Sequence, residues 1–360
     1  MKTEIVTVVS NSNIHGIDSD ADAATLEALK KAGSIIRGGG LVAFPTETVY
    51  GLGGDALNSD SSRKIYAAKG RPSDNPLIVH ISRWEDLATV ARVIPKQAQL
   101  LARRFWPGPL TMIFQKTDAV PLETTGGLDT VAVRFPSHPI AQKFIEESGG
   151  FVAAPSANLS GRPSPAKARY VVEDMDGRID MILDGGDVGI GIESTIIDLS
   201  GEVPVLLRPG YVTIEMLREL LPAVEVDPTI LDGDCKQPPK APGMRYRHYA
   251  PKGKLTIVEG ERESVAELIN RLCEEGMAQG RKVGVIATSE NCPLYKADVV
   301  KNVGSRADEE EIAGNLYNIL REFDDEDVEI MYSESLDFGG LGQAIMNRLL
   351  KAAGHEVIRA

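Results

Sequence analysis

Short apolar runs alternate with amphipathic segments over the first 220 residues, and each run predicts a buried strand. Residues 22–37 place Leu26, Leu29 and Ile36 on one side of a predicted helix. Residues 59–69 predict a second helix, N-capped by Ser59 or Asp60 and ended by Gly70. The predicted strands are residues 41–44, 77–81, 110–115, 131–135, 152–155, 181–184, 194–199 and 205–208. This pattern predicts an α/β domain over residues 1–220.

The pattern changes after residue 220. Residues 221–254 are rich in proline and lose periodicity, which predicts a linker. Beyond them, apolar runs again alternate with helical segments, so residues 255–360 are expected to form a smaller doubly wound, Rossmann-like α/β domain. Its predicted strands are residues 255–258, 282–287, 297–303 and 328–332, and its predicted helices are residues 264–279, 309–323 and 342–353.

Composition and charge limit the classes of partner and the location that can be expected. A chain of 360 residues suits two domains, and its net charge of -13 argues against nucleic acid as the main partner. The three cysteines, Cys235, Cys273 and Cys292, are far apart and odd in number, which suits reduced thiols and gives no metal-binding spacing. No apolar run approaches membrane-spanning length, and residues 1–16 lack the pattern of a signal peptide. We therefore expect a cytoplasmic protein without a membrane partner.

Small polar side chains follow the first predicted strands. Thr46, Thr48 and Tyr50 come where a loop leaves residues 41–44, and Lys69 and Arg71 fall at a helix exit. His80 lies near the end of the next strand. Such strand ends are where open α/β sheets gather ligands, so the pattern predicts a site for a small polar substrate and a polyphosphate.

The familiar nucleotide-binding motifs are missing. There is no Gly-x-x-x-x-Gly-Lys-Ser/Thr loop, and the glycine clusters at residues 38–40 and 185–191 do not match the dinucleotide fingerprint. If ATP binds, side chains must hold it, and Lys69, Arg71 and Arg208 can neutralise phosphates. A lone Lys or Arg is usually a surface charge, but the fixed backbone of Lys69-Gly-Arg-Pro72 favours a site.

Other candidates have structural alternatives. His80 could be a hydrogen-bonded core histidine, residues 155–158 could be a simple turn, and residues 193–195 could be the entry to a strand. Arg134 stands in the apolar run 131–135, where a cation needs an anion. A substrate carboxylate would serve as well as an internal Asp or Glu.

Several ordered motifs give the chain a specific resemblance over about residues 22–251. They are Pro45-Thr-Glu-Thr-Val-Tyr-Gly-Leu52, Lys69-Gly-Arg-Pro72 with Asn75-Pro76, Trp106-Pro-Gly-Pro-Leu-Thr111, Val133-Arg-Phe-Pro136, Ala154-Pro-Ser-Ala-Asn158 with Ser160-Gly161, Glu193-Ser-Thr195, Arg208-Pro-Gly210 and Pro242-Gly-Met-Arg-Tyr-Arg-His-Tyr-Ala-Pro251. With these motifs the chain resembles the YrdC-like threonylcarbamoyl-AMP synthases in their long two-domain form. The resemblance implies a YrdC-like twisted mixed sheet in the first domain.

The resemblance also implies an activity and partners. Members of this family make threonylcarbamoyl-AMP and pyrophosphate from L-threonine, bicarbonate or CO2, and ATP. A separate transferase then modifies tRNA, so contact with tRNA would be only indirect. Mg²⁺ is implied by the triphosphate and needs no protein metal site, because it often keeps waters and phosphate oxygens as ligands.

The roles of individual residues follow from the same resemblance. L-threonine would be surrounded by Thr48, His80, Arg134, Ala154 and Ser194. ATP would be held by Lys69, Arg71, Asn75, Thr130, Ser156, Ser164, Arg208 and Tyr246. Lys69 and Arg71 would act on the reacting phosphates. Residues 238–251 could be a passive, proline-stiffened spacer. Their own cations and aromatic rings, between Gly243 and Pro251, instead predict a lid that folds over the site with Tyr246 touching the nucleotide.

Two alternatives belong to other classes. A double-stranded RNA-binding module is a known use of a similar fold, but the acidic chain makes it secondary. Another carbamoyl-transfer enzyme, of the hydrogenase-maturation type, would carry an acylphosphatase-like region and zinc-finger cysteines, and the sequence shows neither.

Overall fold

The computed structural model describes residues 2–9, 20–230, 248–336 and 339–360. The chain divides into two compact units. The first comprises Met1–Ser160 and Ser164–Arg245, and the second comprises Gly161–Pro163 and Tyr246–Ala360. The three residues directly before Ser164 therefore belong to the second unit.

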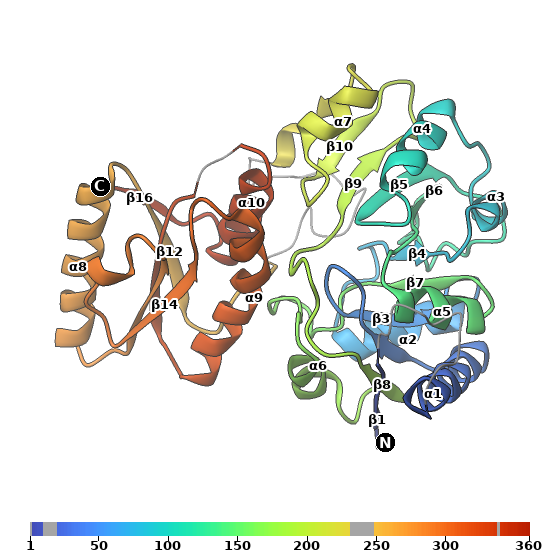
Figure 1. The fold of residues 1–360 in the computed structure, drawn as a ribbon, viewed down its shortest axis with the longest axis horizontal. Coiled ribbons are helices and arrows are strands. Elements are labelled where there is room, and N and C mark those ends of the chain that lie inside the picture. Colours follow the sequence, from blue (N-terminus) through green and yellow to red (C-terminus); the bar gives the residue numbers. More distant parts are fainter. Residues whose placement is uncertain (1, 10–19, 231–247, 337–338) are drawn as a thin grey trace. The chain divides into compact units, whose positions relative to one another are not determined.

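The first unit is built on one mixed sheet of 11 strands, with the order β1-β8-β2-β3-β7-β4-β6-β5-β9-β10-β11 (Figure 1). This confirms the expected mixed-sheet α/β fold. The strands are β1 (Glu4–Thr7), β2 (Val42–Phe44), β3 (Gly51–Asp55), β4 (Ile78–His80), β5 (Leu110–Gln115), β6 (Thr130–Arg134), β7 (Val152–Ala154), β8 (Met181–Asp184), β9 (Thr195–Asp198), β10 (Val205–Arg208) and β11 (Glu225–Val226). The helices are α1 (Asp20–Arg37), α2 (Ser59–Lys69), α3 (Leu87–Val90), α4 (Lys96–Phe105), α5 (Pro139–Glu147), α6 (Ala168–Met175) and α7 (Ile214–Leu220).

Helix α2 forms over the residues that the sequence predicts. Its N-cap is Asn58, whose side chain accepts a hydrogen bond from Asp60 N, so neither Ser59 nor Asp60 is the cap. Gly70 ends the helix with φ 61°, a left-handed conformation that glycine adopts without steric cost. This exit fixes where Lys69 and Arg71 leave the helix.

Strand β3 was not predicted, because its sequence Gly-Leu-Gly-Gly-Asp has little strand propensity. A Cβ at Gly51 or Gly53 would lie 3.1 Å from the Phe44 ring. The missing side chains therefore let Phe44 lie across its neighbouring strand, where its ring stands at 90° to that of His80 with the centroids 6.1 Å apart. Packing overrides propensity at this position.

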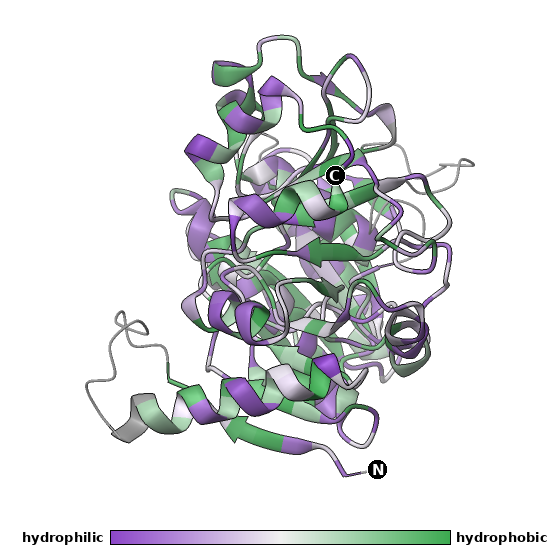
Figure 2. Cartoon of the chain, turned by 90° about the vertical axis from the view of Figure 1, so that its right-hand side faces the viewer, coloured by the Kyte–Doolittle hydropathy of each residue, from purple (hydrophilic) through white to green (hydrophobic). Residues whose placement is uncertain are grey.

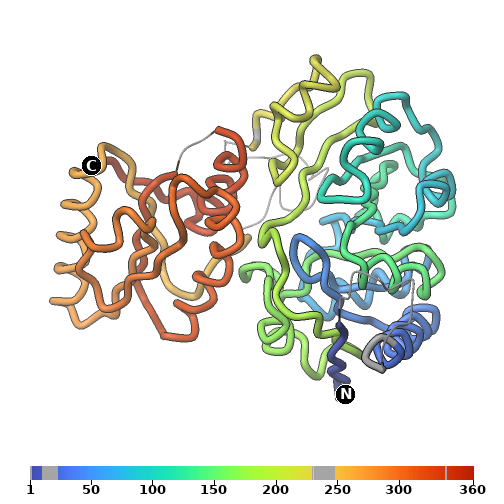
Figure 3. Tube along the Cα trace, in the orientation of Figure 1, coloured from blue at the N-terminus to red at the C-terminus, as the bar shows by residue number. Residues whose placement is uncertain are grey.

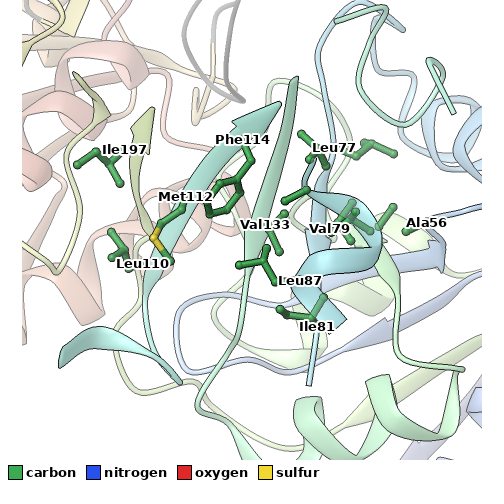
Figure 4. Close-up of a cluster of buried hydrophobic side chains, with 14 of the residues drawn as sticks. Ala56, Leu77, Val79, Ile81, Leu87, Leu110, Met112, Phe114, Val133 and Ile197 are labelled. Atoms are coloured by element: carbon green, nitrogen blue, oxygen red, sulfur yellow. The ribbon is translucent and has the colours of Figure 1, made fainter. Parts of the chain in front are cut away.

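The two faces of the central strands differ. Val79, Val133, Met112 and Phe114 belong to the large apolar core on one face, part of which Figure 4 shows. Because side chains alternate along a strand, Ile78 and Ala132 point to the other face, into a smaller apolar cluster with Ile113, Ile196 and Leu207. In Figure 2 the strands are coloured mostly as hydrophobic, and the helices carry both hydrophobic and hydrophilic residues.

The second unit holds a sheet of five parallel strands in the order β14-β13-β15-β12-β16. Figure 3 shows the path of the chain through this unit. Helix α8 lies on one side of this sheet, and α9 and α10 lie on the other (Figure 1). The expected doubly wound α/β fold is confirmed. The elements are β12 (Lys254–Glu259), α8 (Arg262–Ala278), β13 (Val283–Thr288), β14 (Val299–Gly304), α9 (Glu309–Asp325), β15 (Ile330–Glu334), α10 (Gly342–Ala352) and β16 (Val357–Arg359).

The expected linker, residues 221–254, has structure at both ends. Val226 of β11 pairs with Leu206 of β10, so the first sheet continues past residue 220. Strand β12 begins at Lys254, and residues 231–247 lie outside the described part of the chain. None of the helices that the structure describes has the length and apolar character needed to cross a membrane.

Candidate active site

The predicted threonine-binding residues lie at the ends of neighbouring strands of the first sheet. His80 and Arg134 are the last residues of β4 and β6, and Ser194 directly precedes β9. Ala154 is the last residue of β7, which runs antiparallel to β4, so it lies opposite Ile78 and not beside His80. His80 pairs in register with Arg134 of the adjacent strand. Paired residues share a face, so both side chains lie on the face of the smaller apolar cluster. Thr48 lies in the loop between β2 and β3 and contacts Arg134.

Arg134 is bound by two residues of that loop. Its Nη1 donates to Thr48 Oγ1 at 2.9 Å, and its Nη2 lies 2.8 Å from Glu47 Oε1. Both charged side chains are almost fully buried. Burial alone would raise the pKa of Glu47, but the attraction of Arg134 outweighs it and holds the pKa below its ordinary value. An internal carboxylate therefore partly neutralises Arg134.

The loop that carries Glu47 and Thr48 is held by backbone bonds. Ile190 N donates to Glu47 O at 2.9 Å, and Gly191 N donates to Thr48 O at 3.0 Å. Thr46 Oγ1 donates to Val49 O at 2.7 Å, so the hydroxyl proton of Thr48 is the one that bridges to Thr46 at 2.9 Å. The free capacity of Thr48 Oγ1 is therefore that of an acceptor.

His80 is a neutral imidazole in this structure. Its Nδ1 lies 3.1 Å from Ile78 O. Burial, followed by the charge of Arg134, lowers its pKa to about 3. At neutral pH the ring adds no charge beside Arg134, and both the core and the site interpretations of His80 are compatible with this geometry.

Ser194 belongs to a small polar network with Thr111 and Arg208. Ser194 Oγ lies 2.8 Å from Thr111 Oγ1. Arg208 donates to Ser194 twice, from Nε to the carbonyl at 3.0 Å and from Nη2 to Oγ at 3.2 Å. A Cβ at Gly210 would lie 2.5 Å from Thr195 N, so this glycine lets the Arg208-Pro-Gly210 turn close against Ser194.

Lys69, the last residue of α2, joins the C-terminal end of this helix to the loop after β7. Its ammonium group donates to the carbonyls of Ser156 and Asn158 and is almost fully buried. Ser156 Oγ in turn bonds Asn158 Oδ1. The ammonium group thus has a fixed position next to the loop residue Ser156.

Arg71 and Asn75 belong to the loop between α2 and β4. Arg71 donates to Asn75 O at 3.2 Å and to Pro76 O at 3.0 Å, and both residues are buried. Asn75 Oδ1 is buried and has no hydrogen-bond partner among the residues that the structure describes. A Cβ at Gly126 would lie 3.0 Å from Asp74, so a neighbouring glycine turn supports this loop. Arg71 therefore shapes the loop as well as presenting a charge.

The remaining predicted residues lie apart from these contacts. Ser164 Oγ donates to Glu193 Oε1 at 2.6 Å, next to Ser194 in sequence. Thr130 is half-buried at the opposite end of β6 from Arg134, on the same face. Tyr246 and most of the expected lid lie outside the described residues, which include only residues 248–251 of it.

Sequence reasoning assigned no role to three residues of this region, Glu47, Thr111 and Glu193. All three stand inside motifs that carry the resemblance, and Glu47 and Glu193 are each next to a predicted site residue. The motifs therefore marked these positions but could not identify their partners. The pairs Glu47–Arg134, Thr111–Ser194 and Glu193–Ser164 each join residues that are distant in sequence.

The region offers cations, hydroxyls and an amide, and these groups suit a carboxylate and phosphates. Among the residues that the structure describes, no group of three or more His, Cys, Asp or Glu side chains could hold a metal ion.

Comparison with known proteins gives the same two-part division. Residues 34–210 match a family model described as "Telomere recombination", and residues 212–354 match one described as "Threonylcarbamoyl-AMP synthase, C-terminal domain". The chain is 48% identical over 331 residues to the threonylcarbamoyl-AMP synthase of Pyrococcus abyssi, covering 92% of this chain and 95% of that one. It is 50% identical over 332 residues to that of Bacillus subtilis, covering 92% and 94%.

A solved structure extends the similarity to the whole fold. The crystal structure of P. abyssi Sua5 complexed with L-threonine matches with a TM-score of 0.91 and 45% sequence identity. The match covers 99% of this chain and all of that one, given as 100%. Both units are therefore shared with that protein.

Proposed function

The chain belongs to the threonylcarbamoyl-AMP synthase family, and we propose that it joins L-threonine, CO2 from bicarbonate and the AMP part of ATP at the ends of β4, β6, β7 and β9. It is an enzyme of the nucleotidyltransferase type. The observation that carries the proposed site is Arg134: within the described part of the chain its buried Nε and Nη2 have no hydrogen-bond partner, although Glu47 lies 2.8 Å from Nη2. A buried guanidinium with unused donors suits a substrate carboxylate.

L-threonine is proposed to bind with its carboxylate on Arg134. Thr48 and Ser194 would contact the substrate hydroxyl, with Thr48 as an acceptor. His80 would contribute a neutral ring, and Ala154 would contribute its backbone and a small side chain that leaves room. The P. abyssi structure complexed with L-threonine supports this proposal, because that protein is 45% identical to this chain.

ATP is proposed to bind beside the threonine. Lys69 and Arg71 would act on the reacting phosphates, while the other nucleotide contacts would come from Asn75, Thr130, Ser156, Ser164, Arg208 and Tyr246. Asn75 supports this role because its buried Oδ1 lacks a hydrogen-bond partner. Mg²⁺ would accompany the triphosphate and add positive charge at the phosphates, held by phosphate oxygens and water.

The proposed reaction needs no protein nucleophile. The threonine nitrogen bonds to the carbon of CO2 and releases one proton to solvent, which gives a carbamate. A carbamate oxygen then bonds to the α-phosphorus, and the bond from that phosphorus to the bridging oxygen breaks as pyrophosphate leaves with the electron pair. Buried cations align the two anions and reduce their repulsion.

The product carries an activated carbamoyl group, so we expect a transferase to use it as a substrate. We propose that this transferase carries the threonylcarbamoyl group to tRNA, and that the present chain touches tRNA only through it. The comparisons support the synthase and give no support to a double-stranded RNA-binding module or another carbamoyl-transfer enzyme.

The test is pyrophosphate release that depends on threonine. Purified protein with ATP, bicarbonate and Mg²⁺ is expected to release pyrophosphate with L-threonine and far less with valine, which lacks the hydroxyl. Arg134→Met is expected to abolish threonine binding measured by calorimetry. Release that ignores threonine would contradict the reaction, and unchanged threonine binding in Arg134→Met would contradict the site.

A further inference from the structure

Gly161–Pro163 belongs to the second unit although it interrupts the first unit in sequence. On its N-terminal side, Ser160 N donates to Lys69 O at 2.9 Å, and Lys69 binds the carbonyls of Ser156 and Asn158. On its C-terminal side, Ser164 donates to Glu193. This three-residue segment therefore connects two parts of the proposed ATP site.

Arg321 of α9 binds this segment directly. Its Nε and Nη2 donate to Pro163 O at 3.1 and 2.6 Å. Arg321 is only 1% exposed, and burial of a guanidinium is costly unless hydrogen bonds compensate for it. Two charge-assisted donors on one carbonyl fix the position of Pro163.

Other residues of the second unit hold the same segment. Ala250 N donates to Gly161 O at 2.8 Å. Asp324, three residues after Arg321, lies 3.8 Å from Arg162 and accepts a hydrogen bond from Lys252 N at 2.6 Å. Each residue of the segment thus has a partner in the part of the chain after residue 247.

We propose that Arg321 is a positioning residue for ATP, because it fixes the backbone between Ser156 and Ser164. The inference rests on the proposed ATP site. It gives the C-terminal unit a part in the synthase reaction without supplying a reacting group: the unit holds the loop that presents nucleotide contacts. The proposed partner of the threonine carboxylate, Arg134, lies on β6 and outside this loop, so the effect on ATP is expected to exceed the effect on threonine.

The experiment measures binding of ATP and of L-threonine separately, by calorimetry, to full-length variants. Arg321→Met is expected to weaken ATP binding by at least about tenfold, since a shift of about 1 Å in a positioning group has large effects, while threonine affinity stays within about twofold of wild type. Arg321→Lys should recover part of the loss. The matched control is Arg281→Met, which removes an exposed guanidinium of the same unit that pairs with Glu329.

A second variant keeps the test valid if Arg321→Met fails to fold. Pro163→Gly leaves Arg321 in place and loosens the backbone that it binds, so it should show the same selective loss of ATP affinity. The proposal is overturned if both variants fold and bind ATP like wild type while Ser164→Ala weakens ATP binding. It is also overturned if ATP and threonine affinity fall equally.

A failure of the ATP site itself gives a different result. In that case Ser164→Ala and Lys69→Met would also leave ATP affinity unchanged. The two outcomes are thus distinguished by the Ser164 and Lys69 variants.

Discussion

Glu47 and Arg134 form a buried ion pair in which the carboxylate oxygen lies 2.8 Å from Nη2, yet neither group makes a well-directed hydrogen bond to the other. The pair therefore supplies charge neutralisation, while Nη1 donates to Thr48 and the buried Nε and Nη2 make no hydrogen bond to the described residues. An internal anion and a substrate carboxylate were alternatives at the sequence level. The geometry allows both, because Glu47 stabilises Arg134 before the substrate arrives.

Glu47→Gln is expected to destabilise the protein without ligand. Removing one partner of a buried ion pair typically costs about 3 kcal/mol, because the other charge stays buried. A bound threonine carboxylate would replace the lost anion, so threonine should raise the melting temperature of Glu47→Gln more than that of wild type. The control is Asp118→Asn, which breaks the exposed pair with Arg92 and should change neither quantity. An equal threonine-induced shift in both proteins would contradict the role of Arg134.

Lys69→Met is expected to lower threonine-dependent pyrophosphate release by at least about a hundredfold, because it removes a preorganised cation near the leaving group. The same change should also cost about 1–3 kcal/mol of stability, since the buried carbonyls of Ser156 and Asn158 lose their donor. Both effects can be separated by measuring turnover at a temperature where the variant is folded. Lys64→Met is the control: it lies on the same helix, is exposed, and donates only to Gly39 O. Normal turnover in folded Lys69→Met would refute the assignment.

The pKa of His80 predicts a pH dependence of stability. Because that pKa is lowered to about 3, the unfolded chain binds a proton below pH 6.5 that the folded chain does not bind. Stability should therefore fall as pH falls, by about 1.4 kcal/mol per unit from this group, or about 2 kcal/mol between pH 6.5 and 5. His138, whose pKa is also lowered by burial, adds to the slope.

The measurement is urea unfolding of wild type and His80→Gln between pH 5 and 7. This range lies above the ordinary Glu pKa of 4.5, so the loss of Glu47 stabilisation, which occurs only as pH falls through its lowered pKa, does not interfere. His80→Gln should show a shallower slope, because the contribution of His80 is removed while that of His138 remains. An unchanged slope would mean that His80 is charged in the folded protein.

The sequence predicted elements best where local signals and packing agree. Residues 59–69, 110–115, 181–184 and 205–208 are helix or strand over the predicted bounds, because periodicity or an apolar run is reinforced by burial. β3 escaped prediction because its glycines are explained only by the Phe44 ring that crosses them. Such a cause lies in tertiary contact and leaves no local pattern.

The site residues also divide into those that local sequence could predict and those that depend on tertiary contacts. Residue types at strand ends pointed to Arg134 and Ser194, and the structure places Arg134 at the end of β6 and Ser194 directly before β9, with β5 between these two strands. Their partners Glu47 and Thr111 could not be chosen, since which loop faces which strand depends on the order of strands in the sheet. Tyr246 stays a prediction, because it lies outside the described residues.

Gly210→Ala is expected to impair threonine binding although residue 210 carries no functional side chain. The added Cβ would lie 2.5 Å from Thr195 N and 2.8 Å from Glu193 O, distances at which backbone must move. That movement would displace Ser194 from Thr111 and Arg208, so threonine affinity should fall by about tenfold or more, because misplacement of about 1 Å in a binding group can cost a hundredfold. The control is Gly201→Ala, whose Cβ would meet nothing closer than Val203 O at 4.0 Å, and which should bind threonine normally. Calorimetry on both variants tests the point, and equal affinity in Gly210→Ala and wild type would show that the turn does not set the position of Ser194.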